Sequence, residues 1–151
     1  MKRERGLDLS DKRSEAVLDA SVLVQAVVRE EYTEGALRLI GVLKTIYAPS
    51  LILYEIANTL VMLVRRRLLA EEDAMRKFNH IIRIPTFNIK DPELSRAMDI
   101  AMELELTVYD ASYLALALET ETPLITADNT LCDKGRRIAK VVHVSEADGY
   151  L

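Results

Sequence analysis

The sequence of 151 residues has little of what zinc sites and disulfide frameworks are built from. It contains one cysteine, Cys132, and two histidines, His80 and His143. A single cysteine excludes a disulfide within the chain, and so few sulfur and imidazole groups exclude a Cys-rich zinc site or a histidine cluster. Any metal bound by this chain would therefore be held mainly by oxygen, which favours Mg²⁺ or Mn²⁺.

Long apolar runs are also missing. Charged residues interrupt each hydrophobic stretch before the ~18 residues that a membrane-spanning helix needs. The start, MKRERGLDLSDKRSE, lacks the apolar centre of a signal peptide. We therefore expect a cytoplasmic protein that does not enter a membrane. Half of the residues are apolar and 29% are charged, as in folded globular chains.

The net charge of −4 does not decide whether a polyanion binds. Without the four carboxylates singled out below, the charge would be −4 + 4 = 0. Negative charge gathered in one site, and offset there by divalent cations, is compatible with RNA as a partner.

Short apolar segments that alternate with helical ones predict an α/β fold. We expect residues 1–14 to form a charged arm and residues 15–151 to form a single domain. The expected strands are 16–18, 45–49, 85–89, 123–127 and 141–144; the expected helices are 21–31, 33–44, 51–67, 70–83, 91–105, one that follows Asp110, and 129–139. Because the strand segments are mostly apolar throughout, the pattern indicates a parallel sheet covered on both faces. In such folds, sites form at the carboxyl ends of strands.

Three aspartates each stand between an apolar segment and a predicted helix. They are Asp19 in VLDASVLV, Asp110 in VYDASYLAL and Asp128 in ITADNTL. Aspartate is a preferred helix N-cap, worth about 1 kcal/mol, so capping explains each residue taken alone. Burying a lone carboxylate is costly, however, unless it is paired, protonated or bound to a cation. The alternative to capping is that these residues meet at one site.

Capping cannot explain Glu55, which lies in the middle of the predicted helix LILYEIANTLVMLV. That helix is apolar almost all round, which predicts burial on most sides, and Glu55, Asn58 and Thr59 form one narrow polar stripe on it. We expect the stripe to face a cleft or a partner; an exposed Glu55, or one paired with an arginine, is the simpler alternative. Thr126 is placed to orient the carboxylate of Asp128 or a metal-bound water.

Four carboxylates brought together would repel one another, and their pKa values would rise unless cations neutralised them. Two hard cations held by the four acids would solve this problem. Such a pair can activate water for phosphodiester cleavage and stabilise the leaving oxygen. Asp133, a fifth acid nearby in sequence, is better explained as a solvated helix residue.

The segments VLDASVLV, YEIANTL, TVYDASYLALA and TPLITADNTL resemble the motifs of PIN-domain ribonucleases, especially VapC-type toxins of toxin–antitoxin pairs. They occur in the order found in that family, across roughly residues 15–146. The resemblance implies a three-layer α/β/α domain with a short parallel central sheet and Mg²⁺- or Mn²⁺-dependent endoribonuclease activity. It also implies frequent homodimers and a small antitoxin that occupies the acidic groove.

Carried over by position, the resemblance implies a catalytic set of Asp19, Glu55, Asp110, Asp128 and Thr126, with the four acids as metal ligands. Asn58 matches a polar position after the glutamate of the family. The charged arm before Ser14 is longer than the usual start of the family.

Basic residues that follow Asp128 would supply a surface for RNA phosphates. They are Lys134, Arg136 and Arg137, and a second basic cluster, Arg65–Arg67, closes the long helix. Such contacts would make the affinity for RNA depend on salt concentration, but they would not make binding specific for an RNA sequence. Basic residues near helix C-termini are also ordinary dipole partners, so both interpretations stay open. Tyr113 is expected either near the site or in the core.

Two other functions remain open. A non-catalytic module that binds metal or RNA during RNA processing would keep the same acids. A phosphotransfer domain would also have an aspartate after its first strand. The phosphatase type needs a second aspartate two positions later, where this chain has Ser21, and the acid pair and lysine of a receiver domain have no convincing counterparts.

Overall fold

The computed structural model of the protein describes residues 14–150, so the predicted charged arm lies, except for Ser14, outside the described residues. In chain order the elements are β1 (Glu15–Leu18), α2 (Ala20–Val27), α3 (Thr33–Val42), β2 (Thr45–Ala48), α4 (Leu51–Arg65), α5 (Glu71–Ile82), β3 (Phe87–Ile89), α6 (Leu94–Leu104), α7 (Val108–Thr120), β4 (Leu124–Thr126), α8 (Asn129–Gly135), β5 (Val141–His143), the 3₁₀ helix η1 (Val144–Glu146) and α9 (Ala147–Tyr150).

The strands form one sheet in the order β3-β2-β1-β4-β5, and every neighbouring pair is parallel. The chain builds outward from β1 through β2 to β3, and then returns to the other side of β1 to add β4 and β5. The direction of building therefore reverses between β1 and β4. Open parallel sheets bind ligands at such a reversal, outside the carboxyl ends of the strands.

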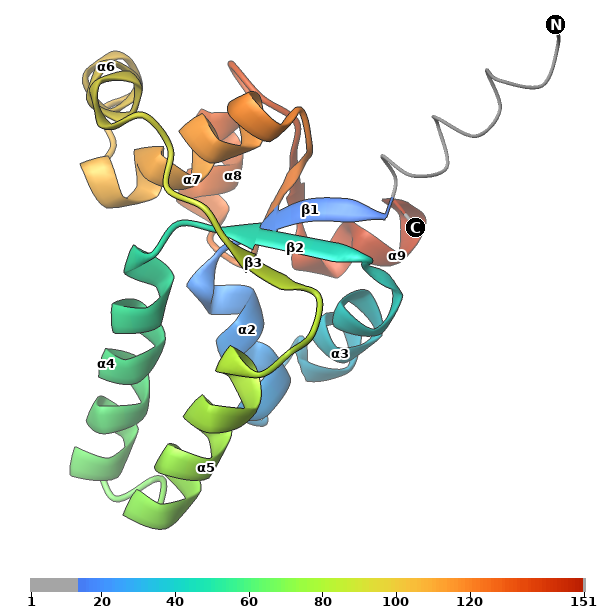
Figure 1. Cartoon of the computed structure of the whole chain (residues 1–151), viewed down its shortest axis with the longest axis vertical. Helices are drawn as coiled ribbons and strands as arrows, with labels where there is room; N and C mark the ends of the chain where they lie inside the picture. Colours follow the sequence, from blue (N-terminus) through green and yellow to red (C-terminus); the bar gives the residue numbers. More distant parts are fainter. Residues whose placement is uncertain (1–13, 151) are drawn as a thin grey trace, which may run out of the picture.

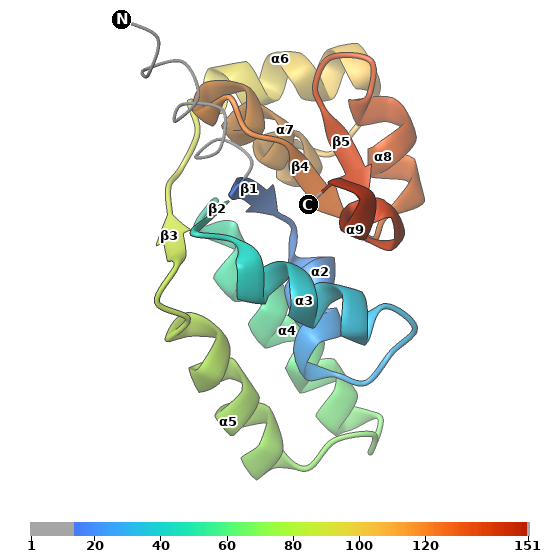
Figure 2. The same cartoon turned by 90° about the vertical axis from the view of Figure 1, so that its right-hand side faces the viewer.

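Helices cover both faces of the sheet (Figure 1). The helices α2, α3, α4 and α5 lie on one side, and α6, α7 and α8 lie on the other, as the turned view in Figure 2 also shows. Right-handed crossovers explain this division, because the chain builds the two halves of the sheet in opposite directions. The predicted three-layer α/β/α architecture is confirmed.

The core forms where the apolar strands meet these helices. Ala16, Val17 and Leu18 of β1 are fully buried, as are the three residues of β4. At the edge of the sheet, β3 is half-buried only at Phe87, because one of its sides has no neighbouring strand. The two strands at the reversal point, β1 and β4, therefore lie in the middle of the core.

The prediction that the long helix α4 is buried on most sides is wrong. It buries one face, formed by Ile52, Ile56 and Leu60. On its opposite face Tyr54 is 79% exposed and Val61 is 45% exposed. The physical reason is that α4 lies in an outer layer, packed against α2 and α5, so that an apolar sequence alone does not bring it into the interior.

Two helices also begin elsewhere than predicted. Asp91 does not open α6, which starts at Leu94; its carboxylate instead accepts hydrogen bonds of 2.7 and 2.8 Å from the backbone N–H and hydroxyl of Ser50, at the start of α4. Helix α7 starts at Val108 rather than after Asp110, because the side chain of Thr107 caps it by accepting the Asp110 N–H.

Within residues 14–150, no helix has the length and apolar character needed to cross a membrane.

Candidate active site

Asp19 stands at the carboxyl end of the central strand. It is the N-cap of α2 and accepts the Ser21 N–H with one carboxylate oxygen. Its other oxygen accepts the hydroxyl of Thr126, the last residue of β4. The register makes this contact possible, because Leu18 pairs with Ile125 and so brings the next residue of each strand to the same level. Asp19 therefore caps a helix and also joins the two strands that flank the reversal point.

Thr126 and Asp128 form the β4 side of the site. The Thr126 hydroxyl is fully buried, and it also accepts the backbone N–H of Asp128 at 3.0 Å. The carboxylate of Asp128 caps α8 by accepting the Leu131 N–H at 3.0 Å. One hydroxyl thus fixes the positions of two acids that are far apart in the sequence.

Glu55 and Asp110 come from helices on opposite sides of the sheet. Glu55, on α4, is half-buried and accepts a 2.6 Å hydrogen bond from the Tyr113 hydroxyl of α7. Asp110 occupies the first turn of α7, where the positive end of the helix dipole favours a carboxylate. Capping by Thr107 leaves the carboxylate of Asp110 without a role at the N-cap, so the capping interpretation is wrong for this residue.

The four predicted acids line one pocket of about 350 Å³. Its complete lining is Asp19, Ala20, Ser21, Val24, Gln25, Glu30, Glu55, Thr59, Asp110 and Asp128. We call it the acidic pocket. Of the predicted polar stripe on α4, Glu55 and Thr59 face this pocket, whereas Asn58 is exposed and does not line it.

Burial and the charges of neighbouring acids raise the pKa values of three carboxylates in the pocket. Burial raises the pKa of Asp19, and the nearby charge of Asp128 raises it further, against the lowering effect of the bonds from Thr126 and Ser21. Burial likewise raises the pKa values of Glu55 and Asp110, and the charge of Asp19 adds to both. The pocket therefore holds carboxylates that are costly to keep ionised together.

These residues fit a hard divalent cation by chemistry. The acids present only oxygen ligands. Burial, and to a smaller extent repulsion between carboxylates, raises the pKa values of Asp19, Glu55 and Asp110, and Mg²⁺ or Mn²⁺ would relieve both costs. Across the described part of the chain, no group of three or more Asp, Glu, His or Cys side chains already lies close enough together to hold a metal ion. Asp19, Glu55 and Asp128 are each oriented by hydrogen bonds from the protein. In Glu55 and Asp128 the bond engages one carboxylate oxygen, which leaves the other oxygen for a cation.

The predicted RNA-contacting residues of the α8 region lie outside the acidic pocket. The ammonium group of Lys134 donates to the backbone oxygen of Glu105 at 2.8 Å. The guanidinium of Arg136 donates to the backbone oxygen of Val141 and to the carboxylate of Glu146. Arg137 is exposed. Lys134 and Arg136 therefore have structural partners in this region.

Three polar lining residues were absent from the sequence prediction: Ser21, Gln25 and Glu30. Ser21 lies two residues after Asp19, and its hydroxyl and backbone N–H both bond to that carboxylate, so its place in VLDAS was an available signal. Gln25 lies one helical turn after Ser21, which could have placed both on one face of α2. No sequence pattern pointed to Glu30, which lies in the loop between α2 and α3.

Comparisons with known proteins agree with this geometry. A family described as "PIN domain" matches residues 16–137. The chain is 32% identical over 124 residues to Ribonuclease VapC3 of Pyrobaculum aerophilum, with 78% of this chain and 92% of that protein covered. It is also similar to the crystal structure of a protein from the same organism, with a TM-score of 0.69 and 26% identity, covering 88% of this chain and 92% of that one.

Proposed function

The chain belongs to the PIN-domain family, as a VapC-type member, and we propose that it is a metal-dependent endoribonuclease that acts as the toxin of a toxin–antitoxin pair. One observation carries the proposal: Asp19, Glu55, Asp110 and Asp128 come from different parts of the chain and line a single pocket. Its position outside the carboxyl ends of β1 and β4 is the usual place for a site in a parallel sheet.

The four acids would hold Mg²⁺ or Mn²⁺, and Thr126 would keep Asp19 in position. When bound, a divalent cation supplies an activated water and stabilises the negative charge that develops during phosphodiester cleavage. Among the described residues that line the pocket there is no histidine or lysine to serve as a general base. The contribution of the chain is therefore to bind the cation, to exclude bulk water and to orient the strand.

Two hydroxyl groups limit how the acids can turn. Thr126 contacts Asp19 and the backbone of Asp128, and Tyr113 contacts Glu55. Side chains that are already oriented lose less entropy when they bind a cation or a substrate. In this proposal Thr126 and Tyr113 act through the acids rather than on the RNA.

The proposal extends to partners. The similarity to Ribonuclease VapC3 supports RNA as substrate and a small antitoxin that covers the acidic pocket. RNA is a polyanion, and the acidic pocket would repel it. Divalent cations would offset this repulsion, so cleavage should depend steeply on their concentration. We also propose that the active form is a homodimer.

The test is a cleavage assay on a mixed RNA pool, with Mn²⁺ or Mg²⁺ and with EDTA. Wild type is expected to cut only with the metal, and Asp19→Asn is expected to cut with neither. If metal raises the melting temperature of the wild type but no RNA is cut, the protein is a binding module and the nuclease proposal is wrong. Covalent labelling of Asp19 by a phosphate analogue would instead favour a phosphotransfer domain.

A further inference from the structure

Gln25 is a buried polar residue on the wall of the acidic pocket. It is the single glutamine of the sequence, and it lies on α2 with 9% of its surface exposed. The residues before it on the helix, Val22 to Val24, belong to the apolar core. A buried amide in such surroundings needs hydrogen-bond partners to offset its loss of water.

Within residues 14–150, the oxygen end of this amide has a hydrogen-bond partner and the nitrogen end has none. Gln25 Oε1 accepts the backbone N–H of Tyr32 at 3.1 Å. Because a backbone N–H can only donate, this bond fixes which end of the amide is oxygen. Nε2 donates to no other group in residues 14–150, although Gln25 lines the acidic pocket. Among the described residues, no fully buried side-chain nitrogen lacks a partner, so Nε2 keeps contact with solvent, and the acidic pocket is the cavity that Gln25 lines.

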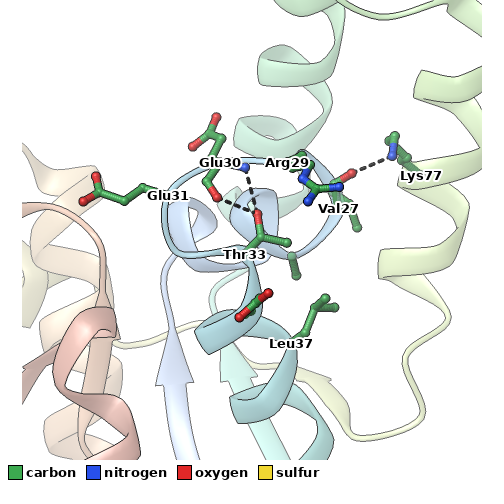
Figure 3. Close-up of a pocket in the computed structure, with 9 residues that line it drawn as sticks. Val27, Arg29, Glu30, Glu31, Thr33, Leu37 and Lys77 are labelled. Atoms are coloured by element: carbon green, nitrogen blue, oxygen red, sulfur yellow. Dashed lines mark hydrogen bonds between the residues drawn. The ribbon is translucent and has the colours of Figure 1, made fainter.

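The loop that supplies the Tyr32 N–H is itself held by hydrogen bonds, which Figure 3 draws around the neighbouring cavity. Thr33 accepts the Glu30 N–H at 2.8 Å and its hydroxyl donates to the backbone oxygen of Glu30, while Lys77 donates to the backbone oxygen of Val27. Glu30 lines both this cavity, of about 500 Å³, and the acidic pocket. The orientation of the Gln25 amide is thus fixed by an ordered loop.

The other polar groups that line the acidic pocket do not offer a free N–H. The acids accept hydrogen bonds when ionised, and the hydroxyl of Thr59 donates to the backbone oxygen of Glu55. The hydroxyl of Ser21 bonds to the carboxylate of Asp19. Among the described lining residues, Gln25 is therefore the one side chain that presents N–H donors to a bound molecule.

We propose that Gln25 Nε2 donates a hydrogen bond to an oxygen of the RNA backbone, either a phosphate oxygen or a 2′-hydroxyl, beside the bond to be cut. The inference rests on the proposed function and names a further substrate-contacting residue for it. A neutral amide suits this place, because it donates to an anionic strand without competing with the cation for the four acids. Hydrogen bonds to charged groups are stronger than those between neutral groups.

A purely structural role for Gln25 makes a different prediction. If its only task were to accept the Tyr32 N–H, any side chain with an oxygen at that place would serve. Gln25→Glu keeps this acceptor but loses the donors and adds a charge. Gln25→Met is of similar length and uncharged, and loses both donor and acceptor. The loss of the N–H donors is the one change that the two variants share, so donation predicts a loss of activity in both.

The experiment measures kcat/KM for RNA cleavage and the melting temperature of both variants beside wild type. It also measures the RNA affinity of each change in the non-cleaving Asp110→Asn background. We expect both variants to lose roughly tenfold or more in kcat/KM and in affinity, while Gln25→Glu keeps the wild-type melting temperature with metal present. A loss in Gln25→Met alone would indicate a structural role, and a loss in Gln25→Glu alone would indicate charge repulsion; either overturns the inference.

The substrate provides an independent control. The probes are oligonucleotides with one 2′-deoxy position or one uncharged methylphosphonate linkage. At one position near the cut, this change in the RNA is expected to weaken binding to wild type. The same change is expected not to weaken binding to Gln25→Met, because that variant has already lost the contact. If the loss of affinity from the RNA change and the loss from Gln25→Met simply add at every position, the proposed contact does not exist. If wild type cuts RNA and both variants cut it equally well, this inference fails alone; if wild type cuts no RNA, the proposed function fails as well.

Discussion

The hydroxyl of Tyr113 donates a 2.6 Å hydrogen bond to the carboxylate of Glu55. The bond joins α7 to α4, two helices on opposite sides of the sheet, at the wall of the acidic pocket. Tyr113 is almost fully buried, and burial together with the nearby carboxylates raises its pKa far above the usual range. The phenol therefore keeps its proton and remains a donor, so both expectations for Tyr113, in the core and near the site, are met by one residue.

Tyr113→Phe is expected to lower the free energy of unfolding by about 1–3 kcal/mol, because Glu55 loses its donor while it stays half-buried. The bond lowers the pKa of Glu55, so its removal should raise that pKa. Chemical denaturation and an NMR titration of the Glu55 carboxyl measure the two effects. Tyr109→Phe is the matched control, since Tyr109 is 67% exposed; an equal effect of both changes would contradict the assignment.

Asp110→Asn is expected to abolish metal-dependent RNA cleavage and to leave the fold intact. Thr107 caps α7, so the helix does not need this carboxylate. Without metal the variant should be as stable as wild type or more so, because a charge that repels Asp19 and Asp128 is gone. Cleavage assays and thermal unfolding in EDTA measure both effects. Asp133→Asn, an exposed change outside the pocket, should still cut; retained cleavage by Asp110→Asn would overturn its catalytic role.

Stability without metal should depend on pH through the pocket. Asp19, Glu55 and Asp110 have pKa values raised above their ordinary values near 4. Above that pH the folded state holds more protons on these groups than the unfolded state does, so their contribution to stability falls as pH rises toward the folded-state pKa values. Unfolding in EDTA at several pH values tests this, and Asp110→Asn should show a weaker fall than wild type. Mg²⁺ should stabilise the wild type more at pH 7 than at pH 5; the reverse order would contradict the sign.

Gly135→Ala is expected to destabilise the fold by about 1–3 kcal/mol through overpacking. A Cβ there would lie 2.8 Å from Leu114 Cδ2 and 2.9 Å from Val141 Cγ2, because α8 packs closely on α7 and β5. Gly41→Ala is the matched control, since its Cβ would meet no atom within 4 Å and alanine favours the helix. Urea denaturation should therefore separate the two variants; similar midpoints would show that the contact around Gly135 adapts without cost.

The central features of the fold were predictable because they depend on patterns within short segments. Apolar runs located the strands, and the rule that sites form at carboxyl ends placed Asp19 and Asp128 together. Asp110 was harder, since a capping residue and a first-turn acid look alike in sequence. Thr107, three residues earlier, decides between them by accepting the Asp110 N–H.

Features that depend on neighbours distant in the sequence were not predictable in the same way. Asp91 looked like the start of α6, but its partner is Ser50 at the start of α4. For Lys134 and Arg136 the sequence left RNA contact and helix-dipole pairing open, and it gave no sign of the partners that both residues have on other segments. The spacing of Gln25 from Ser21 could place Gln25 on the same face of α2, but its hydrogen bond to the N–H of Tyr32 could not be predicted, because folding brings that loop beside it.

The pairing of β1 with β4 also sets an order of events during synthesis. Asp19 leaves the ribosome early, whereas Thr126 and Asp128 belong to about the last sixth of the chain. A nascent or truncated chain that ends before β4 lacks Thr126 and Asp128, and so lacks one of the four acids and the hydroxyl that orients Asp19. Synthesis must therefore pass β4 before the proposed activity can appear.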